Sequence, residues 1–349
     1  MVDIADVRAA RERIRDRVRR TPLVHPGPVH DPLPGGGRLS LKLECLQVTG
    51  SFKARGATNK LLTLPAEEVR RGLVTASGGN HGLGVAYAGW QAKTPATIYL
   101  PANAPESKAD KLRLWGAEVV RAGEVWDDAN AAAQEFAAAA GRPYVHPFAD
   151  SAIIAGQGTI ALEVLEDAPE TDVLLVAIGG GGLISGVALA AKALKPGIQV
   201  IGVEPVGAPT LYESLRAGRV VELAEIRTAA NTLAARRTEP IDFDIIRANV
   251  DEIVLVTDEE MRAAARWLWF ELGIAAELSG AASLAALQAG RYRPPAGAQV
   301  CALICGAGTD GIGGERVDLL SLAGAVKSKV KGVTLAAMDD AIREAASKE

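Results

Sequence analysis

The chain has 349 residues, of which 48% are hydrophobic and 23% charged, and its formal net charge at pH 7 is −4. These values are typical of a soluble globular protein, and they provide no basic surface for nucleic acid. Three cysteines do not make a disulfide framework, the N-terminus lacks a signal-peptide pattern, and the longest apolar stretch, residues 172–194, is interrupted by four glycines. We therefore expect a cytoplasmic protein that binds neither membrane nor nucleic acid.

The elements expected in chain order alternate between helices and strands. An amphipathic helix comes first, with Ile4, Val7, Ile14 and Val18 on its apolar face. Longer helical patterns cover residues 104–115, 125–140 and 258–273, and a last helix is expected within residues 334–349. Short apolar runs predict strands at residues 72–77, 96–101, 117–122, 172–178, 198–205, 252–258 and 298–306.

Strands that are apolar on both faces and alternate with helices indicate the α/β class, with parallel sheets covered by helices on both sides. The strands fall into two groups, separated by the alanine-rich helix and residues 141–150. We therefore expect two lobes with a cleft between them. Ligands of such sheets bind beyond the carboxyl ends of the strands, and here glycine-rich loops follow three strands, at residues 77–82, 179–186 and 305–314.

The first two of these loops are suited to anions. The four glycines at residues 179–182 let backbone N–H groups converge at the start of a helix, which favours a phosphate group. The loop at residues 77–82 offers a hydroxyl, an amide, an imidazole and free backbone donors, which suit a carboxylate. His81 on its own is more typical of a packed histidine, and the four histidines show no zinc-site spacing.

The third loop, residues 305–314, matches GxGxxG, but the acidic residue that a dinucleotide site needs about twenty residues later is absent. Lys53 is a charged residue in "QVTGSFKARGAT", a segment rich in small residues, and neither a helical nor a strand pattern explains a charged side chain at this position. A phosphate site, a carboxylate site and an isolated lysine together favour Schiff-base catalysis with pyridoxal phosphate. A surface lysine in a non-catalytic phosphate-binding or dinucleotide-binding protein remains the alternative.

Taken together and in order, these motifs resemble those of the fold type II pyridoxal-phosphate enzymes, and among them the threonine and serine dehydratase group that includes serine racemases. The resemblance runs from "RTPL" near Thr21 to "CGAGTD" near Asp310. It implies a two-domain α/β fold similar to the β subunit of tryptophan synthase, and a homodimer. The large domain would comprise residues 1–48 and 143–325, the small domain residues 49–142, and a C-terminal tail or helix residues 326–349.

The resemblance also assigns roles to individual residues. Lys53 would bind the cofactor covalently, Asn80 would bond to its 3-hydroxyl group, and Cys305 would lie beside the pyridine nitrogen. The substrate carboxylate would be bound by Ser77 and by the backbone of Gly78, Gly79, Asn80 and His81. Phe52 would flank the ring, and the phosphate would be held by Gly179, Gly180, Gly181, Gly182 and Leu183.

The implied reaction is a β-elimination that converts an L-β-hydroxy amino acid, such as L-threonine or L-serine, to a 2-oxo acid and ammonia. Serine racemases carry a second serine where this chain has Gly78, so racemisation is the alternative rather than the expectation. Asn231 and Thr232 differ from many relatives, which leaves 3-hydroxyaspartate or a β-aryl serine as alternative substrates. Glu204 and Ala208 match a metal loop of the racemases, but Thr210 replaces its third ligand, so no divalent metal is expected.

Overall fold

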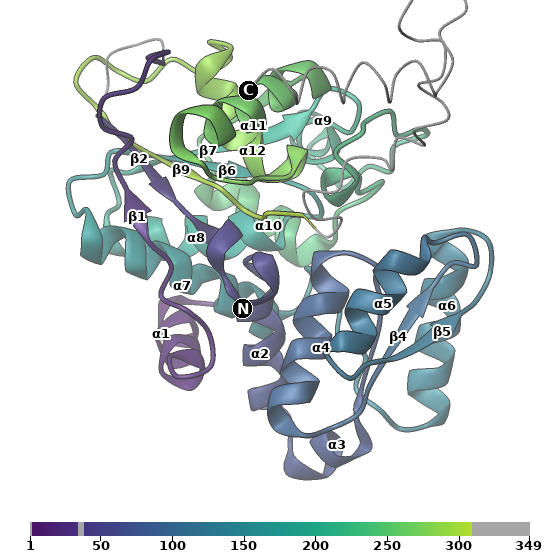
Figure 1. Cartoon of the computed structure of the whole chain (residues 1–349). Coiled ribbons are helices and arrows are strands. Elements are labelled where there is room, and N and C mark those ends of the chain that lie inside the picture. The colour runs from purple at the N-terminus through teal and green to yellow at the C-terminus, as the bar shows by residue number, and fades with distance from the viewer. Residues whose placement is uncertain (1, 34–37, 309–349) are drawn as a thin grey trace, which may run out of the picture. The chain divides into compact units, whose positions relative to one another are not determined.

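The computed structural model describes residues 2–33 and 38–308. Within these residues the strands form two sheets (Figure 1). The smaller sheet is parallel and has the order β3 (Leu73–Ala76), β4 (Ala96–Leu100), β5 (Glu118–Arg121). The larger one has the order β1 (Leu23–Val24), β2 (Arg38–Lys42), β9 (Gln299–Leu303), β6 (Val173–Ala177), β7 (Gln199–Pro205), β8 (Glu252–Val256).

Every neighbouring pair in the larger sheet is parallel except β1 with β2. The predicted α/β class with parallel sheets is therefore confirmed. Strands β1 and β2 were not predicted from the sequence. The sequence of β2, "RLSLK", contains Ser40 and Lys42, whose polar side chains are buried. Because of these two polar residues, the segment lacks the continuous apolar pattern by which a central strand is predicted.

The three helices predicted at residues 104–115, 125–140 and 258–273 begin and end within two residues of those bounds, whereas no bounds were predicted for most of the other helices. The capping box of Thr257 and Glu260 is present at the start of α11. The first helix ends at Ile14, so Val18 lies beyond it, and the helix predicted within residues 334–349 lies outside the described residues. The helices are α1 (Ile4–Ile14), α2 (Lys53–Thr63), α3 (Ala66–Arg71), α4 (Asn80–Ala92), α5 (Glu106–Leu114), α6 (Trp126–Ala139), α7 (Ser151–Asp167), α8 (Gly182–Leu194), α9 (Thr210–Ala217), α10 (Pro240–Asn249), α11 (Asp258–Leu272) and α12 (Leu278–Gln288).

The small sheet is buried on both faces, as its apolar strands predict. Leu73 and Ile98 belong to one apolar cluster, which includes residues of α4, whereas Val74 and Tyr99 belong to another, which includes residues of α6. Because successive strand residues point to opposite faces, α4 and α6 cover opposite sides of the sheet. The core of the large sheet is a separate and larger cluster, to which α7, α8, α11 and α12 contribute.

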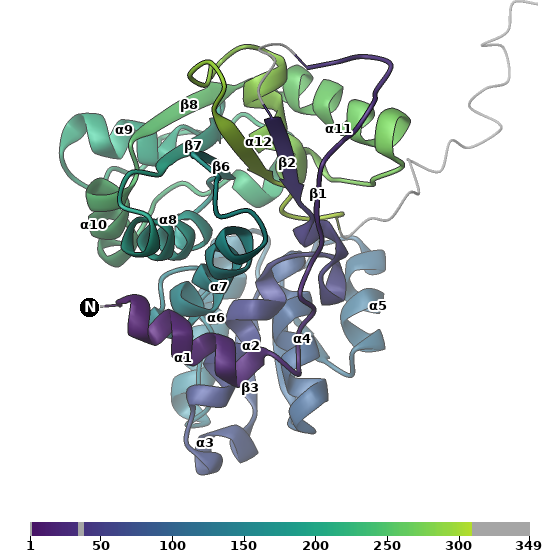
Figure 2. The ribbon, with the colours of Figure 1, turned by 90° about the vertical axis from the view of Figure 1, so that its left-hand side faces the viewer.

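Helix α7 lies between α2 and α8 (Figures 1 and 2). Glycines allow both close approaches: a Cβ atom on Gly156 of α7 would lie 2.7 Å from the Cα of Gly56 in α2, and one on Gly186 of α8 would lie 2.6 Å from the nitrogen of Gly158 in α7. Interiors packed this tightly transmit position from one element to the next. The start of α2 is thus held in a fixed relation to the start of α8.

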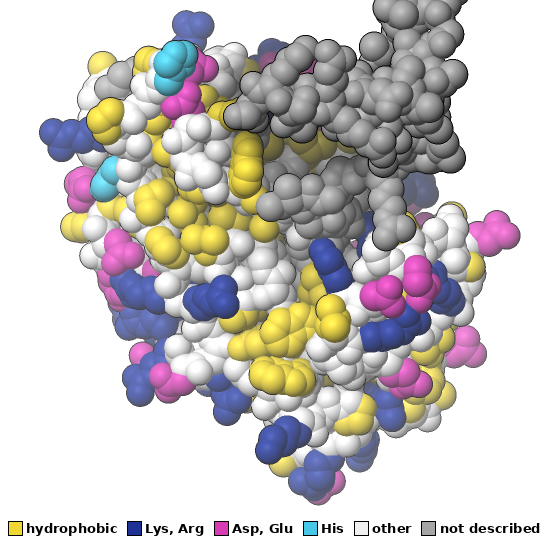
Figure 3. Space-filling view, in the orientation of Figure 1, with side chains coloured by type: hydrophobic (Ala, Val, Ile, Leu, Met, Phe, Trp, Pro, Cys, Tyr) yellow, Lys and Arg dark blue, Asp and Glu magenta, His cyan; other side chains and the backbone are white. Residues whose placement is uncertain are grey.

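No helix in the described part of the chain is long and apolar enough to cross a membrane. On the face shown in Figure 3, acidic and basic side chains are interspersed, with apolar side chains between them. Large apolar side chains that are exposed include Trp90 on α4, Leu114 on α5 and Phe270 on α11. Phe270 is 76% exposed.

Candidate functional site

Lys53 is the first residue of α2, and its side chain is held at the junction of several loops. The backbone nitrogen of Phe52 donates to the Cys305 carbonyl oxygen at 3.3 Å, which joins the start of α2 to the end of β9. The Lys53 amine donates to the carbonyl oxygen of Pro147 at 2.6 Å. Burial lowers the pKa of Lys53 from 10.5 to about 8, although the nearby Asp242 carboxyl group opposes this shift. At pH 7 roughly a tenth of Lys53 is therefore an unprotonated amine, a far larger fraction than for an ordinary lysine.

The predicted glycine loop joins the end of β6 to the start of α8. A Cβ atom on Gly180 would lie 2.3 Å from the ring of Phe148, and one on Gly182 would lie 2.7 Å from the carbonyl oxygen of the same residue. Gly181 has φ +114°, a backbone conformation that other residues rarely adopt. Phe148 follows Pro147, the acceptor of the Lys53 amine, so the glycine loop and Lys53 meet at the same two residues.

The loop at Ser77 to Gly79 follows β3 and leads into α4. The Ser77 hydroxyl accepts a hydrogen bond from the backbone nitrogen of Gly79 at 3.3 Å. Asn80 is buried, and its amide nitrogen donates to Glu277 Oε1 at 2.6 Å. Its Oδ1 atom has no hydrogen-bond partner within residues 2–33 and 38–308. A Cβ atom on Gly79 would lie 3.9 Å from the side chain of Thr232, which places this loop beside the segment around Thr232. Asn80 thus presents a buried acceptor that a bound hydroxyl group could satisfy.

The imidazole of His81 is packed inward, as a lone histidine in a loop suggested. Its Nε2 atom lies 3.1 Å from Thr75 Oγ1 and 3.0 Å from the carbonyl oxygen of Val145. Burial and the charge of Lys53 lower the pKa of His81 to about 3 and that of His146 to about 4. Both imidazoles are therefore neutral at physiological pH, and neither adds positive charge beside Lys53.

Cys305 lies just beyond β9, and its thiol is buried. Burial raises the pKa of this thiol to about 12, so it stays protonated and neutral. All three cysteines are buried and free. The role predicted for Cys305 needs a neutral neighbour for a ring nitrogen, and a buried thiol meets that requirement.

In the loop that resembles the metal loop of the racemases, Glu204 and Thr210 bond to backbone groups. The two carboxylate oxygens of Glu204 accept hydrogen bonds from the backbone nitrogens of Leu211 and Tyr212, each at 2.8 Å. Thr210 donates its hydroxyl to the carbonyl oxygen of Ala235. Burial raises the pKa of Glu204 to about 8, although the two amide bonds oppose this. Glu204 thus caps the start of α9, and no group of three or more metal-binding side chains is found among the described residues.

Four residues of the site were not identified from the sequence. His146, Pro147 and Phe148 lie in a segment that the sequence indicated only as a boundary between strand groups, and their role depends on long-range contacts. Asp242 lies on the buried side of α10 and packs against the glycine loop. The only signal for Asp242 was an acidic residue beside the apolar Phe243, in a helix that packs against α8.

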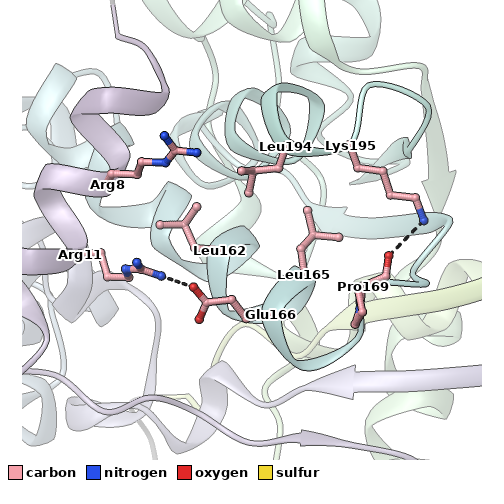
Figure 4. Close-up of a pocket in the computed structure, with 8 residues that line it drawn as sticks. All are labelled: Arg8, Arg11, Leu162, Leu165, Glu166, Pro169, Leu194 and Lys195. Atoms are coloured by element: carbon pink, nitrogen blue, oxygen red, sulfur yellow. Dashed lines mark hydrogen bonds and ion pairs between the residues drawn. The ribbon is translucent and has the colours of Figure 1, made fainter.

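A separate cavity of about 420 Å³ lies where α1 approaches the ends of α7 and α8 (Figure 4). Its charged groups are largely paired, because Arg11 bonds to Glu166 and the Lys195 amine donates to the carbonyl oxygen of Pro169 at 3.3 Å. It has no residue in common with the loops around Lys53. The candidate site is therefore the one that Lys53 and the two glycine loops form.

Comparison with known proteins agrees with this geometry. The chain is 42% identical over 287 residues to an L-threonine ammonia-lyase of Thermotoga maritima, a match that covers 82% of this chain and 71% of that protein. It is 39% identical over 308 residues to a phenylserine dehydratase of Ralstonia pickettii, covering 88% and 94%. The solved structure of maize serine racemase superimposes with a TM-score of 0.82 at 33% identity, covering 93% of this chain and 96% of that one.

A family model described as "Pyridoxal-phosphate dependent enzyme" matches residues 14–306, a range that contains Lys53, both glycine loops and Cys305. The match spans most of the chain, and the solved structure shares the same α/β fold. The chain therefore belongs to the family of pyridoxal-phosphate dependent enzymes.

Proposed function

We propose that the protein is an ammonia-lyase that removes the β-hydroxyl and amino groups of an L-β-hydroxy amino acid and releases a 2-oxo acid and ammonia. The observation that carries this proposal is the Lys53 amine, which is desolvated and bonds to Pro147 beside the glycine loop. Relatives named L-threonine ammonia-lyase and phenylserine dehydratase support a hydroxyl leaving group. L-Threonine, L-serine and a β-aryl serine are the substrates of first choice.

The site fits pyridoxal phosphate on three structural grounds. The loop from Gly179 to Gly182 tolerates no side chain at Gly180 and opens a helix, as a phosphate site requires. The orphaned Oδ1 atom of Asn80 is an acceptor for a hydroxyl group. Lys53 is an amine whose pKa is already low enough to react with an aldehyde near neutral pH.

Each predicted residue then has a physical task. When bound, pyridoxal phosphate would withdraw electrons from the α-carbon of the substrate and make its proton acidic. Lys53, with its lowered pKa, accepts that proton as a general base. The backbone donors from Gly78 to His81, together with Ser77, bind and orient the substrate carboxylate. The neutral thiol of Cys305 supplies no negative charge to the ring nitrogen, which favours elimination over long-lived carbanion chemistry.

Elimination is favoured over racemisation by the absence of a second proton carrier. Gly78 has no side chain, and a Cβ atom there would lie 3.1 Å from Leu100 and 3.5 Å from Lys108. In this direction the loop offers packed side chains rather than a hydroxyl group that could return a proton to the opposite face of the substrate. Serine racemase activity, the function named for the maize structure, is the second candidate.

The remaining features of the enzyme are also proposals. We place the large domain at residues 1–48 and 143–325, the small domain at residues 49–142 and a tail at residues 326–349, and the two separate sheets and apolar cores support the first two. A homodimer is supported by the exposed Phe270, and a cytoplasmic location by three free cysteines. Catalysis without a divalent metal is supported by the occupied carboxylate of Glu204.

The test is a screen of L-threonine, L-serine, 3-hydroxyaspartate and phenylserine for release of 2-oxo acid and ammonia, with chiral analysis of the remaining amino acid. We expect oxo acid and ammonia in equal amounts from at least one substrate, and no effect of EDTA. Lys53→Met is the control and should lower turnover by about 10²–10⁴-fold or more. A D-amino acid formed faster than the oxo acid would show a racemase, and activity lost with EDTA and restored by Mg²⁺ would refute metal-free catalysis.

A further inference from the structure

Asp242 is a buried carboxyl group that packs against the glycine loop and has no role in the mechanism above. Its Oδ1 atom accepts a hydrogen bond at 3.1 Å from the hydroxyl of Ser185, a residue in the first turn of α8. A Cβ atom on Gly181, the N-cap of α8, would lie 2.9 Å from the Asp242 Cβ atom and 3.4 Å from its Cγ atom. The carboxyl group therefore lies at the helix terminus that would hold the phosphate.

The second carboxyl oxygen of Asp242 has no partner among the residues that the structure describes. Its Oδ2 atom is buried without a hydrogen bond, and Asp242 itself is fully buried. The charged groups that act on it are Lys53 on α2 and Glu239 just before α10, and among the described residues the Lys53 amine bonds to the Pro147 carbonyl oxygen rather than to Asp242. Burial raises the pKa of Asp242 to about 8, although Ser185 and Lys53 oppose this shift. Near neutral pH the Asp242 side chain is thus mainly a neutral carboxylic acid, whose O–H group needs a hydrogen-bond acceptor.

A bound phosphate would give that donor an acceptor. Phosphate is close to a dianion above pH 7, because its second pKa is about 6. An ionised carboxylate beside it would add a like charge in a poorly solvated place, which is costly. A protonated carboxyl group would instead form a charge-assisted hydrogen bond to a phosphate oxygen. Asp242 would therefore repel the phosphate when it is ionised and attract it when it is protonated.

We propose that Asp242, as a neutral carboxylic acid, donates a hydrogen bond to the phosphate bound by Gly179 to Gly182, so that its protonation controls phosphate affinity. The inference rests on the cofactor site proposed above and assigns to it a residue that binds the phosphate through a proton. It predicts tight binding of phosphate-bearing ligands near neutral pH and weaker binding as the pH rises above about 8.

The test uses pyridoxine 5′-phosphate, which carries the phosphate group but has an alcohol in place of the aldehyde and cannot react with Lys53. Its affinity for the apoenzyme is measured by calorimetry from pH 7 to pH 9. Because Lys53 titrates in the same range, the comparison is made between Lys53→Met and the double variant Lys53→Met with Asp242→Asn. We expect the affinity of Lys53→Met to fall as the pH rises past the pKa of Asp242, which lies above about 8 once the opposing charge of Lys53 is removed.

Asparagine keeps an N–H donor but cannot ionise, so the double variant should bind with an affinity that does not depend on pH. Equal pH dependence in both proteins would overturn the proposal. Pyridoxine, which has no phosphate, is the control ligand and should show no such dependence in either protein. If pyridoxine 5′-phosphate binds no form of the protein at any pH, the cofactor site itself is wrong, which is a different result from binding without pH dependence.

A second measurement needs no change at Asp242. Calorimetry at pH 8.5 in buffers of different ionisation enthalpy reports the protons taken up when the ligand binds. For Lys53→Met we expect a net uptake, because the bound state keeps Asp242 protonated. Proton release or no exchange would contradict the proposal even if the asparagine variant did not fold.

Discussion

Lys53 and Arg55 lie two residues apart on α2, where Arg55 is buried and Lys53 is half-buried, and the surroundings of the two cations are opposite. Arg55 bonds through its guanidinium to Glu44 at 2.8 Å and to Glu163 at 2.6 Å, and Lys42 bonds to the same Glu163 at 2.6 Å. Burial alone would lower the pKa of Arg55, but the two carboxylates raise it above its ordinary value. Lys53 has a carbonyl oxygen as its hydrogen-bond acceptor, and its pKa falls to about 8.

The comparison indicates that the charge of Arg55 has a structural role, whereas we assign a chemical role to Lys53. Around Arg55 two positive and two negative side chains compensate each other, and they join β2, α2 and α7. Around Lys53 the buried polar atoms are incompletely satisfied, as Asn80 Oδ1, His81 Nδ1 and Asp242 Oδ2 show. Buried polar groups without partners are rare in folded proteins and indicate a binding site when they gather in one place. The paired network holds α2 in position, and the unpaired groups are free to meet a ligand.

The largest effect is expected from breaking the paired network. Arg55→Met leaves Glu44 and Glu163 buried without their main partner, and we expect the free energy of unfolding to fall by about 3–5 kcal/mol in urea denaturation. The matched control is Arg70→Met, which removes the exposed pair with Glu67 and should cost less than about 1 kcal/mol. Equal losses for the two variants would mean that the buried network does not stabilise the fold.

The same substitution at Lys53 should have a smaller effect of opposite sign. The pKa of Lys53 is lower in the folded protein than its ordinary value of 10.5, so its charge destabilises the fold below pH 8, and this penalty disappears as the pH rises from about 8 to 10.5. Because Lys53 is only part-buried, solvent reduces the effect, and Lys53→Met should stabilise the apoprotein by up to about 2 kcal/mol at pH 7.

Urea denaturation of both apoproteins at pH 7 and pH 10 checks this prediction. The stability difference should be largest at pH 7 and close to zero at the higher pH. A loss of stability in Lys53→Met at pH 7 would indicate that Lys53 is paired in the folded protein much as Arg55 is, and the contrast between the two regions would fail.

The glycine loops and Lys53 could be found from the sequence because their signals are local. Four successive glycines after an apolar strand, and a lysine among small residues, indicate their roles within a few positions. The arrangement around Arg55 could not be found in this way, because Glu163 is 108 residues from Arg55 and 121 residues from Lys42 in the chain. Strand β2 was not predicted either, because it contains the polar residues Ser40 and Lys42, whose side chains are buried in the structure.

Asp242 and the segment from His146 to Phe148 were missed for a related reason. Each acquires its role by contact with the glycine loop or with Lys53, which lie far from it in the sequence. The sequence therefore predicted the groups to which we assign the chemistry. The neighbours that we propose act on their charge became apparent only from the packing of α7, α8 and α10.

The central claim is that Lys53 is the amine that binds pyridoxal phosphate covalently. The most direct measurement is to add pyridoxal phosphate to the apoprotein, reduce the carbon–nitrogen bond with borohydride, and map the modified peptide by mass spectrometry. We predict a single pyridoxyl group on the peptide that contains Lys53, and none on that peptide in Lys53→Met. A pyridoxyl group on a different lysine, or full turnover by Lys53→Met, would contradict the account.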